Sequence, residues 1–207
     1  MIKEKTTLNY YNENAEAFCE STKDANMSLC YKMFEKYLPA EAKLLDLGCG
    51  SGRDSKYFIC KGFDVTSVDG SEEICKYASN YLEKQVPCLR FQDMAFNSEF
   101  DGVWACASLL HVNADKLPEI LKRVWKSLKP DGVLYASFKY GTQEREKEGR
   151  YFIDLNETKV YEFFERNGMF QILLCDVTVD VREGRSDEKW INVVAQKVCS
   201  EDIYASL

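Results

Sequence analysis

Three glycines that follow a short apolar run are the first residues with a pattern suited to chemistry. Gly48, Gly50 and Gly52 come after Leu44–Leu47 in the stretch LLDLGCGSGRD. Glycine permits backbone angles closed to other residues and lets a ligand approach the chain closely. The spacing G-x-G-x-G matches neither the dinucleotide fingerprint G-x-G-x-x-G nor the phosphate loop G-x-x-x-x-G-K-[ST]. A phosphate site is therefore not indicated, and a tight turn before a helix explains the loop alone equally well.

Acidic residues follow the next two apolar runs. Asp69 comes 17 residues after Gly52, in VDGSEE. A carboxylate there can accept hydrogen bonds from both hydroxyls of a ribose, or it can cap a helix beginning near Ser71. Asp93 and Met94 end the run PCLRFQDM. Asp93 could accept a hydrogen bond from a purine amine while Met94 lies against the ring, or the two could serve a turn and the core.

The elements that must position these residues alternate between apolar runs and amphipathic stretches. The runs cover residues 43–49, 63–69, 87–94, 100–110 and 131–138. Helices are expected from Arg53, from Ser71 and over Leu117–Leu128. Strands alternating with helices indicate a mainly parallel sheet. We therefore predict an α/β, Rossmann-like, doubly wound fold with a mainly parallel seven-stranded sheet, an antiparallel last strand and helices on both faces.

The two ends of the chain differ from this central part. Residues 7–38 have apolar side chains at helical spacing, and residues 139–154 are polar and are expected to form a long loop. A helix is expected over residues 157–167. The runs 170–181 and 189–198 are joined by too few residues for a parallel crossover, which indicates a hairpin.

Length, composition and charge limit the function classes. The chain has 207 residues, of which 45% are hydrophobic and 29% charged, and this is typical of one globular domain. We divide it into an N-terminal helical lid (1–39), a core (40–138), and a loop, helix and hairpin (139–207). The net charge of −7 disfavours nucleic acid and anionic membranes as partners. No apolar run suggests a membrane span or a secretory signal, so a cytoplasmic monomer or homodimer is expected.

The cysteines do not indicate a metal site or a disulfide framework. They are odd in number and form no C-x-x-C pair, so most are expected to be reduced core residues and no bound metal is expected. The nine positions are Cys19, Cys30, Cys49, Cys60, Cys75, Cys88, Cys106, Cys175 and Cys199.

The motifs in this order resemble a known superfamily. The series LLDLGCGSGRD, VTSVDGS, RFQDMAF, FDGVWACASLLHV and LKPDGVLYASF closely resembles the class I S-adenosylmethionine-dependent methyltransferases, over roughly Asn9 to Val198. It looks most like the small bacterial tellurite-resistance-type enzymes. The resemblance implies S-adenosyl-L-methionine as the cofactor and S-adenosyl-L-homocysteine as its product.

The resemblance also implies a set of cofactor-binding residues. The glycine loop would hold the methionine part, Asp69 the ribose, and Asp93 with Met94 the adenine. Further contacts would come from the end of the fourth strand and from an aromatic pair on the N-terminal helix. The full set is Tyr11, Asp46, Gly48, Cys49, Gly50, Gly52, Arg53, Asp69, Gly70, Asp93, Met94, Ala107 and Ser108.

Methyl transfer from a sulfonium is a direct displacement, so it depends mainly on alignment and on exclusion of water. A general base helps only where the acceptor must lose a proton. The only histidine, His111, follows the fourth predicted strand and could be that base, or it could pack around the cofactor.

The acceptor site is expected to draw on residues outside the core. The candidates are Tyr10, Tyr140, Arg182 and Arg185. Arginines near the cleft could bind a carboxylate or another anion, and aromatic rings such as that of Trp190 could lie near the sulfonium. Alternatively, the two arginines form ion pairs with neighbours in the same loop, namely Glu183, Asp187 or Glu188.

These observations favour a methyltransferase that acts on a small molecule. Methylation of protein or RNA is a second possibility, although the acidic charge counts against RNA. A module that binds S-adenosylmethionine and regulates a partner without catalysis is a third. The glycine spacing counts against a nicotinamide oxidoreductase.

Overall fold

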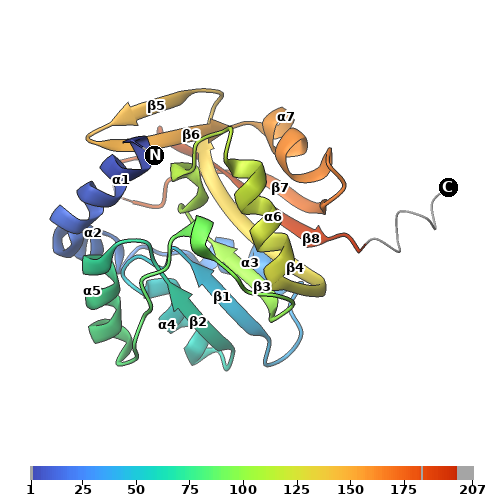
Figure 1. Cartoon of the computed structure of the whole chain (residues 1–207), viewed down its shortest axis with the longest axis horizontal. Coiled ribbons are helices and arrows are strands. Elements are labelled where there is room, and N and C mark those ends of the chain that lie inside the picture. Colours follow the sequence, from blue (N-terminus) through green and yellow to red (C-terminus); the bar gives the residue numbers. More distant parts are fainter. Residues whose placement is uncertain (1, 183, 200–207) are drawn as a thin grey trace.

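A mixed sheet forms the centre of the computed structural model, which describes residues 2–182 and 184–199 (Figure 1). Four parallel strands lie in the order β2 (Asp64–Val68), β1 (Lys43–Leu47), β3 (Phe100–Ala105) and β4 (Leu128–Tyr140). Strand β8 (Lys189–Lys197) is antiparallel to β4, and it pairs in turn with antiparallel β7 (Phe170–Val179). The predicted fold class and the predicted terminal hairpin are confirmed.

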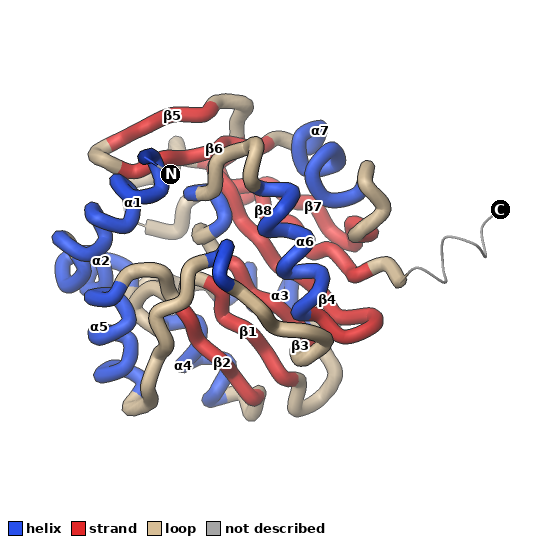
Figure 2. The backbone as a smooth tube through the Cα atoms, in the orientation of Figure 1, coloured by secondary structure: helices blue, strands red, loops and turns tan. Residues whose placement is uncertain are grey.

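Helices cover both faces of this sheet (Figure 2). Consecutive residues of a strand point to opposite faces, and Leu44 and Leu45 accordingly belong to different apolar clusters. Leu45 packs in the cluster of α6 (Leu117–Ser127). Leu44 packs in the cluster of α3 (Ser28–Glu35) and α4 (Arg53–Cys60). Both strand faces are therefore buried, as the near-continuous apolar runs indicate.

The N-terminal part is helical and lies beside α5. Helices α1 (Ile2–Glu13) and α2 (Ala15–Thr22) both contact α5 (Glu72–Leu82), and Figure 1 shows the three side by side. Helix α5 begins after Ser71, whose Oγ accepts a hydrogen bond from the backbone N of Ile74 at 3.3 Å. This cap confirms the predicted start. Within the described residues, no helix is both long and apolar enough to cross a membrane.

The strand expected over residues 87–94 is wrong. Cys88 forms a single parallel bridge to Asp69, and the chain then turns through the 3-10 helix η1 (Phe91–Asp93). The turn is closed by the backbone N of Asp93, which donates to the carbonyl of Arg90 at 2.9 Å. The apolar residues of this segment are therefore held by a turn rather than by a strand ladder.

The long loop expected over residues 139–154 is also wrong. It contains a β-hairpin of β5 (Glu144–Lys147) and β6 (Arg150–Leu155), and β6 runs parallel to the end of β4. Glu148 and Gly149, which join the two strands, have φ of 52° and 74°, the positive values that tight hairpin turns require. The hairpin adds two strands and the strand expected over residues 87–94 is absent, so the described sheet has eight strands instead of the predicted seven.

The remaining predictions have mixed outcomes. The helix expected over residues 157–167 is present as α7 (Glu157–Val160), followed by a π-helical turn, η3 (Tyr161–Glu165). All nine cysteines are free thiols. The expectation that most lie in the core is wrong, because burial is limited to Cys19, Cys30, Cys49 and Cys75.

Candidate functional site

A cavity of about 1390 Å³ opens at the carboxyl ends of β1 to β4. It is larger than the roughly 300–1,000 Å³ of a typical ligand pocket, so it has room for two ligands at once. The glycine loop and residues 88–93 line one end. The hairpins β5–β6 and β7–β8 contribute the opposite side, which we call the hairpin wall: Lys139, Arg145, Lys147, Arg150, Phe152, residues 178–182, Arg185, Glu188, Trp190 and Asn192.

The glycine loop joins β1 to α4 in a conformation that needs glycine. Gly48 has φ +82°, and a Cβ there would lie 2.5 Å from the Cβ of Ser108. Its backbone N, like that of Cys49, donates to the carbonyl of Val68. The loop is thus held against the ends of the neighbouring strands, with its backbone open to the cavity on the other side.

Asp69 connects the glycine loop to the start of α5. Its Oδ2 accepts a hydrogen bond from the backbone N of Gly50 at 3.1 Å, and its Oδ1 accepts one from the backbone N of Ser71 at 3.0 Å. Burial raises the pKa of Asp69, and the backbone N–H groups of Ser71, Gly50 and Gly70 oppose that rise. Each carboxylate oxygen has a second lone pair, so Asp69 can still accept two hydrogen bonds from a ligand.

Arg53 is held at the cavity edge by a buried carboxylate. Asp54 accepts two hydrogen bonds from Arg53, at 2.6 and 2.9 Å, and further ones from Tyr31 and Trp104. Burial acts to raise the pKa of Asp54, but the charge and hydrogen bonds of Arg53 outweigh it and lower that pKa. Arg53 Nη1 also donates to the carbonyl of Thr22 at 3.1 Å. The guanidinium is therefore fixed beside the end of α2.

The segment after Cys88 differs from its prediction in its side chains as well as in its backbone. Asp93 lines the cavity and pairs with Arg90 at 2.8 Å. Met94, in contrast, is only 2% exposed and packs in the α6 cluster, so its predicted contact with a purine is not supported. The apolar side chains of this segment that line the cavity are Leu89 and Phe91. The turn η1 brings Phe91 there, and the strand predicted for this segment could not show that.

His111 forms two hydrogen bonds that fix its tautomer. Its Nδ1 lies 2.7 Å from the carbonyl oxygen of Tyr151, which can only accept, so Nδ1 carries the proton. Its Nε2 lies 2.8 Å from the hydroxyl of Tyr11 and accepts a hydrogen bond from it. Burial lowers the pKa of His111 to about 4 and raises that of Tyr11 to about 12. Both groups are neutral at pH 7, and the lone pair of a possible base is already occupied.

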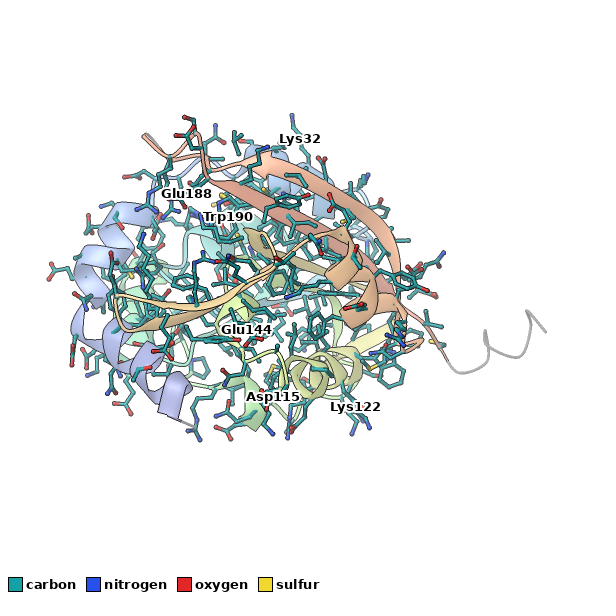
Figure 3. All side chains as sticks on the ribbon, turned by 90° about the horizontal axis from the view of Figure 1, so that it is seen from above. Lys32, Asp115, Lys122, Glu144, Glu188 and Trp190 are labelled. Carbon is teal, nitrogen blue, oxygen red and sulfur yellow. The ribbon has the colours of Figure 1, made fainter. Side chains whose placement is uncertain are left out.

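The hairpin wall contains a linked group of charged side chains. Arg182 donates to both oxygens of Asp180, which also accepts from Trp190 Nε1 at 2.9 Å and from Lys139 Nζ at 3.1 Å. Lys139 lies 4.0 Å from the centroid of the Trp190 ring and also contacts Glu188. In Figure 3, Glu188 and Trp190 accordingly lie close together.

Among the described residues of this loop, one of the ion pairs that the sequence left open is present. Arg185 pairs with Glu188 at 3.6 Å, as predicted. Arg182 instead pairs with Asp180, which precedes the loop. Glu183 lies outside the described residues.

Four more of the predicted residues are absent from the described lining of the cavity. Asp46 is 2% exposed and accepts a hydrogen bond from Ser55 Oγ at 2.6 Å. Gly52 faces Leu82. The ring of Tyr10 packs under the Arg150 guanidinium, and Tyr140 donates to Glu157. The predicted residues that do line the cavity are Tyr11, Gly48, Cys49, Gly50, Arg53, Asp69, Gly70, Asp93, Ala107, Ser108, His111, Arg182 and Arg185.

The sequence is similar to a family model and to two proteins named as methyltransferases. Residues 45–136 match the family model described as a methyltransferase domain. The chain is similar to YqeM of Bacillus subtilis (strain 168), which is named as a methyltransferase, with 37% identity over 119 residues, 52% of this chain and 48% of that protein. It is also similar to "Probable S-adenosyl-L-methionine-dependent methyltransferase TehB" of Haemophilus influenzae (strain 10810), with 31% identity over 40% of this chain and 30% of TehB. The chain thus spans half or less of the length of these relatives.

A solved structure supports the fold over nearly the whole chain. The Burkholderia thailandensis 1,6-didemethyltoxoflavin-N1-methyltransferase, with bound 1,6-didemethyltoxoflavin and S-adenosylhomocysteine, superposes with a TM-score of 0.73. The match covers 93% of this chain and 85% of that enzyme, at 23% identity. At this identity the likeness establishes the shared architecture and nothing finer.

Proposed function

We propose, from the premise that this chain belongs to the class I S-adenosylmethionine-dependent methyltransferase superfamily, that it transfers a methyl group from S-adenosyl-L-methionine to a small-molecule acceptor. The observation that carries the proposal is the pairing of Asp69 with the backbone of Gly50 inside a cavity large enough for two ligands. This hydrogen bond holds a glycine backbone that a ligand can approach closely next to a carboxylate that can accept hydrogen bonds from a ribose.

The residues present fit this cofactor. The backbone from Gly48 to Gly50 would lie against the methionine part, Asp69 would accept hydrogen bonds from the ribose hydroxyls, and Phe91 with Asp93 would contact the adenine. When bound, the cofactor supplies an electrophilic methyl group on a sulfonium. A Cβ at Gly48 would lie 2.5 Å from the Cβ of Ser108, so glycine is needed there for the loop to pack against the residues that follow β3.

The protein's own contribution is alignment and the exclusion of water. We call the end of the cavity lined by the glycine loop and residues 88–93 the cofactor end. Helices α1 and α2 would cover it, because Tyr11, Phe18 and Thr22 all line the cavity. The hydrogen bond from Tyr11 to His111 ties α1 to the residues that follow β3. His111 would then be a positioning residue, since its Nε2 is occupied and its pKa of about 4 makes it a weak base.

A small acceptor is supported by the shape of the site. The second part of the cavity is bounded by short hairpins, and the net charge of −7 counts against RNA. The Burkholderia enzyme of the same architecture is named as a 1,6-didemethyltoxoflavin-N1-methyltransferase and holds 1,6-didemethyltoxoflavin beside S-adenosylhomocysteine. A screen of pooled metabolites for release of S-adenosylhomocysteine would separate this function from a non-catalytic regulatory module, which would release none.

Calorimetric titration with S-adenosylhomocysteine and with NAD tests the cofactor directly. We expect S-adenosylhomocysteine to bind and NAD not to bind. Asp69→Asn should weaken S-adenosylhomocysteine about 10- to 100-fold, because a carboxylate that accepts from two hydroxyls is replaced by an amide with one acceptor oxygen. Asp64→Asn makes the same charge change at an exposed position at the start of β2 and should leave the affinity unchanged. Equal binding of NAD, or an unaffected Asp69→Asn variant, would contradict the proposal.

A further inference from the structure

The hairpin wall has a charge opposite to that of the whole chain. The chain has a net charge of −7. The hairpin wall nevertheless places six cationic side chains against the cavity, with Asp180 and Glu188 as its anionic lining residues. Two of the six, Arg145 and Arg150, are also paired with Asp154 and Glu148 outside the lining, so the local excess of positive charge is smaller than the count of lining residues. A cavity wall with this excess of one sign raises the local concentration of ligands of the other sign. The six cations are Lys139, Arg145, Lys147, Arg150, Arg182 and Arg185.

Arg182 is the member of this group that is best oriented to bind a ligand. Its Nε donates to Asp180 Oδ1 at 2.9 Å and its Nη2 donates to Oδ2 at 2.5 Å, so one side of the guanidinium faces the carboxylate. This leaves the end formed by Nη1 and the second N–H of Nη2. Among the described residues, no hydrogen-bond partner of Nη1 is found. A planar pair of N–H groups of this kind matches a carboxylate bidentately.

Asp180 holds Arg182 rigidly because it is itself fixed. Its side chain is 2% exposed, and it also accepts hydrogen bonds from Trp190, Lys139 and the backbone N of Arg182. These hydrogen bonds, with those of the Arg182 side chain, lower the pKa of Asp180 against the effect of burial, which raises it. The carboxylate therefore stays ionised behind the guanidinium, and little side-chain entropy remains to be lost on binding.

Arg182 and Arg53 line the same cavity. Its pKa is raised, chiefly by the hydrogen bonds to Asp180, while the positive charge of Arg53 opposes that rise. Arg53 and Arg182 thus lie near enough for their charges to interact, one beside the glycine loop and the other on the hairpin wall. An anionic group between them would relieve this repulsion. An acceptor must occupy this side of the cavity if the glycine loop holds the methionine part of the cofactor.

We propose that the methyl acceptor of this enzyme is a small carboxylate, and that the free end of the Arg182 guanidinium, held by Asp180, binds the carboxylate group. The inference rests on the proposed function, because it takes the ligand of the hairpin wall to be the acceptor. The binding of the carboxylate itself depends only on the wall and can be measured separately.

The probes are three small aromatic compounds that differ in one group. Benzoate, benzamide and phenyl phosphate are titrated into the protein saturated with S-adenosylhomocysteine, and into the protein alone, with binding followed by ligand-observed NMR. We expect benzoate to bind at least about tenfold more tightly than benzamide, because only the carboxylate forms the charge-assisted pair. Phenyl phosphate should bind no better than benzoate.

Variants of Arg182 assign the discrimination to this residue. Arg182→Met should remove the preference for benzoate over benzamide, and Arg182→Lys should reduce it, because an ammonium does not form the planar pair. Lys122→Met is the matched control. It removes one positive charge from an exposed position on α6, outside the described lining of the cavity (Figure 3), and should keep the full preference. Thermal unfolding shows whether each variant is folded, and the lysine variant remains informative if the methionine variant is not.

The possible outcomes are distinct. Equal binding of benzoate and benzamide by the wild-type protein would overturn the proposal, as would a preference unchanged in Arg182→Lys and Arg182→Met. Much tighter binding of phenyl phosphate would overturn the carboxylate class. A failure of S-adenosylhomocysteine to bind would instead contradict the proposed function, and the benzoate titration of the protein alone would still decide whether the wall binds carboxylates.

Discussion

The contacts that build the two sides of the cavity differ in how far apart their residues lie in the sequence. At the cofactor end, the connection from Gly50 to Asp69 spans 19 residues, and that from Asp69 to Ser71 spans two. At the hairpin wall, Lys139 contacts Asp180 and Glu188, which lie 41 and 49 residues away. The match to the family model ends at residue 136, before the wall begins. The family model therefore describes the cofactor end and not the hairpin wall, so under the proposed function the acceptor would be selected by pairings that the family motifs do not describe.

The largest effect is expected from a substitution in the glycine loop. In Gly48→Ala the new Cβ would lie 2.5 Å from Ser108 Cβ at a φ of +82°. Overpacking and a left-handed backbone together should lower the free energy of unfolding by about 2 to 5 kcal/mol. Chemical denaturation measures this loss. Binding of S-adenosylhomocysteine should weaken more than tenfold in the folded fraction, because the loop must shift.

Gly62 offers a control that separates the effect of the close contact from the effect of the left-handed backbone. It has φ +91°, but a Cβ there would have nothing within 4 Å. Gly62→Ala should therefore cost only the backbone term of about 1 to 2 kcal/mol and leave the affinity for S-adenosylhomocysteine unchanged. Equal losses in both variants would show that the close contact with Ser108 does not shape the cofactor end.

The second-largest effect is a pH dependence of the free energy of unfolding that comes from His111, which lines the cavity. Its pKa is about 4 in the folded protein, against about 6.5 when exposed. The unfolded chain therefore binds more protons between these values, so stability is full above about pH 6.5 and falls as the pH drops toward 4. The loss should reach about 3 kcal/mol. Urea denaturation at several pH values measures it.

The variant His111→Gln supplies the comparison, because His111 is the only histidine in the chain. Its unfolding free energy should lack this part of the pH dependence, while the contribution of the carboxylates remains. Parallel curves for the two proteins between pH 7 and pH 4 would mean that burial does not lower the pKa of His111.

The sequence was sufficient to predict the parts of the site that depend on neighbours in the chain. The glycine loop, Asp69 and the helix beginning after Ser71 follow from turn and cap chemistry, and the described structure has them where they were expected. Met94 was misplaced because a strand ending at residue 94 would expose it, whereas the turn η1 buries it and presents Phe91.

The hairpin wall could be predicted only in part, because its order comes from pairing over long distances. The residues of β5 are all polar, and all but the half-buried Arg145 are exposed, so its segment lacks the alternation of apolar and polar residues that marks a strand. Strand β6 has that alternation in Tyr151 and Ile153, which are buried, and this signal could have been found. The role of Asp180 as the partner of Arg182 and Lys139 depends on the register of β7 with β8, which composition does not specify.

The smallest effect is expected from the hydroxyl that connects α1 to His111. Tyr11→Phe removes the hydrogen bond to Nε2 and should lower the free energy of unfolding by about 1 kcal/mol. The pKa of His111 should rise, because the hydrogen bond that favours its neutral form is lost, and NMR titration of the single histidine measures this. Tyr10→Phe is the matched control, since the contact of Tyr10 with Arg150 is made by its ring. If both variants leave the histidine pKa unchanged, the Tyr11 hydroxyl does not connect α1 to the junction between the cofactor end and the hairpin wall.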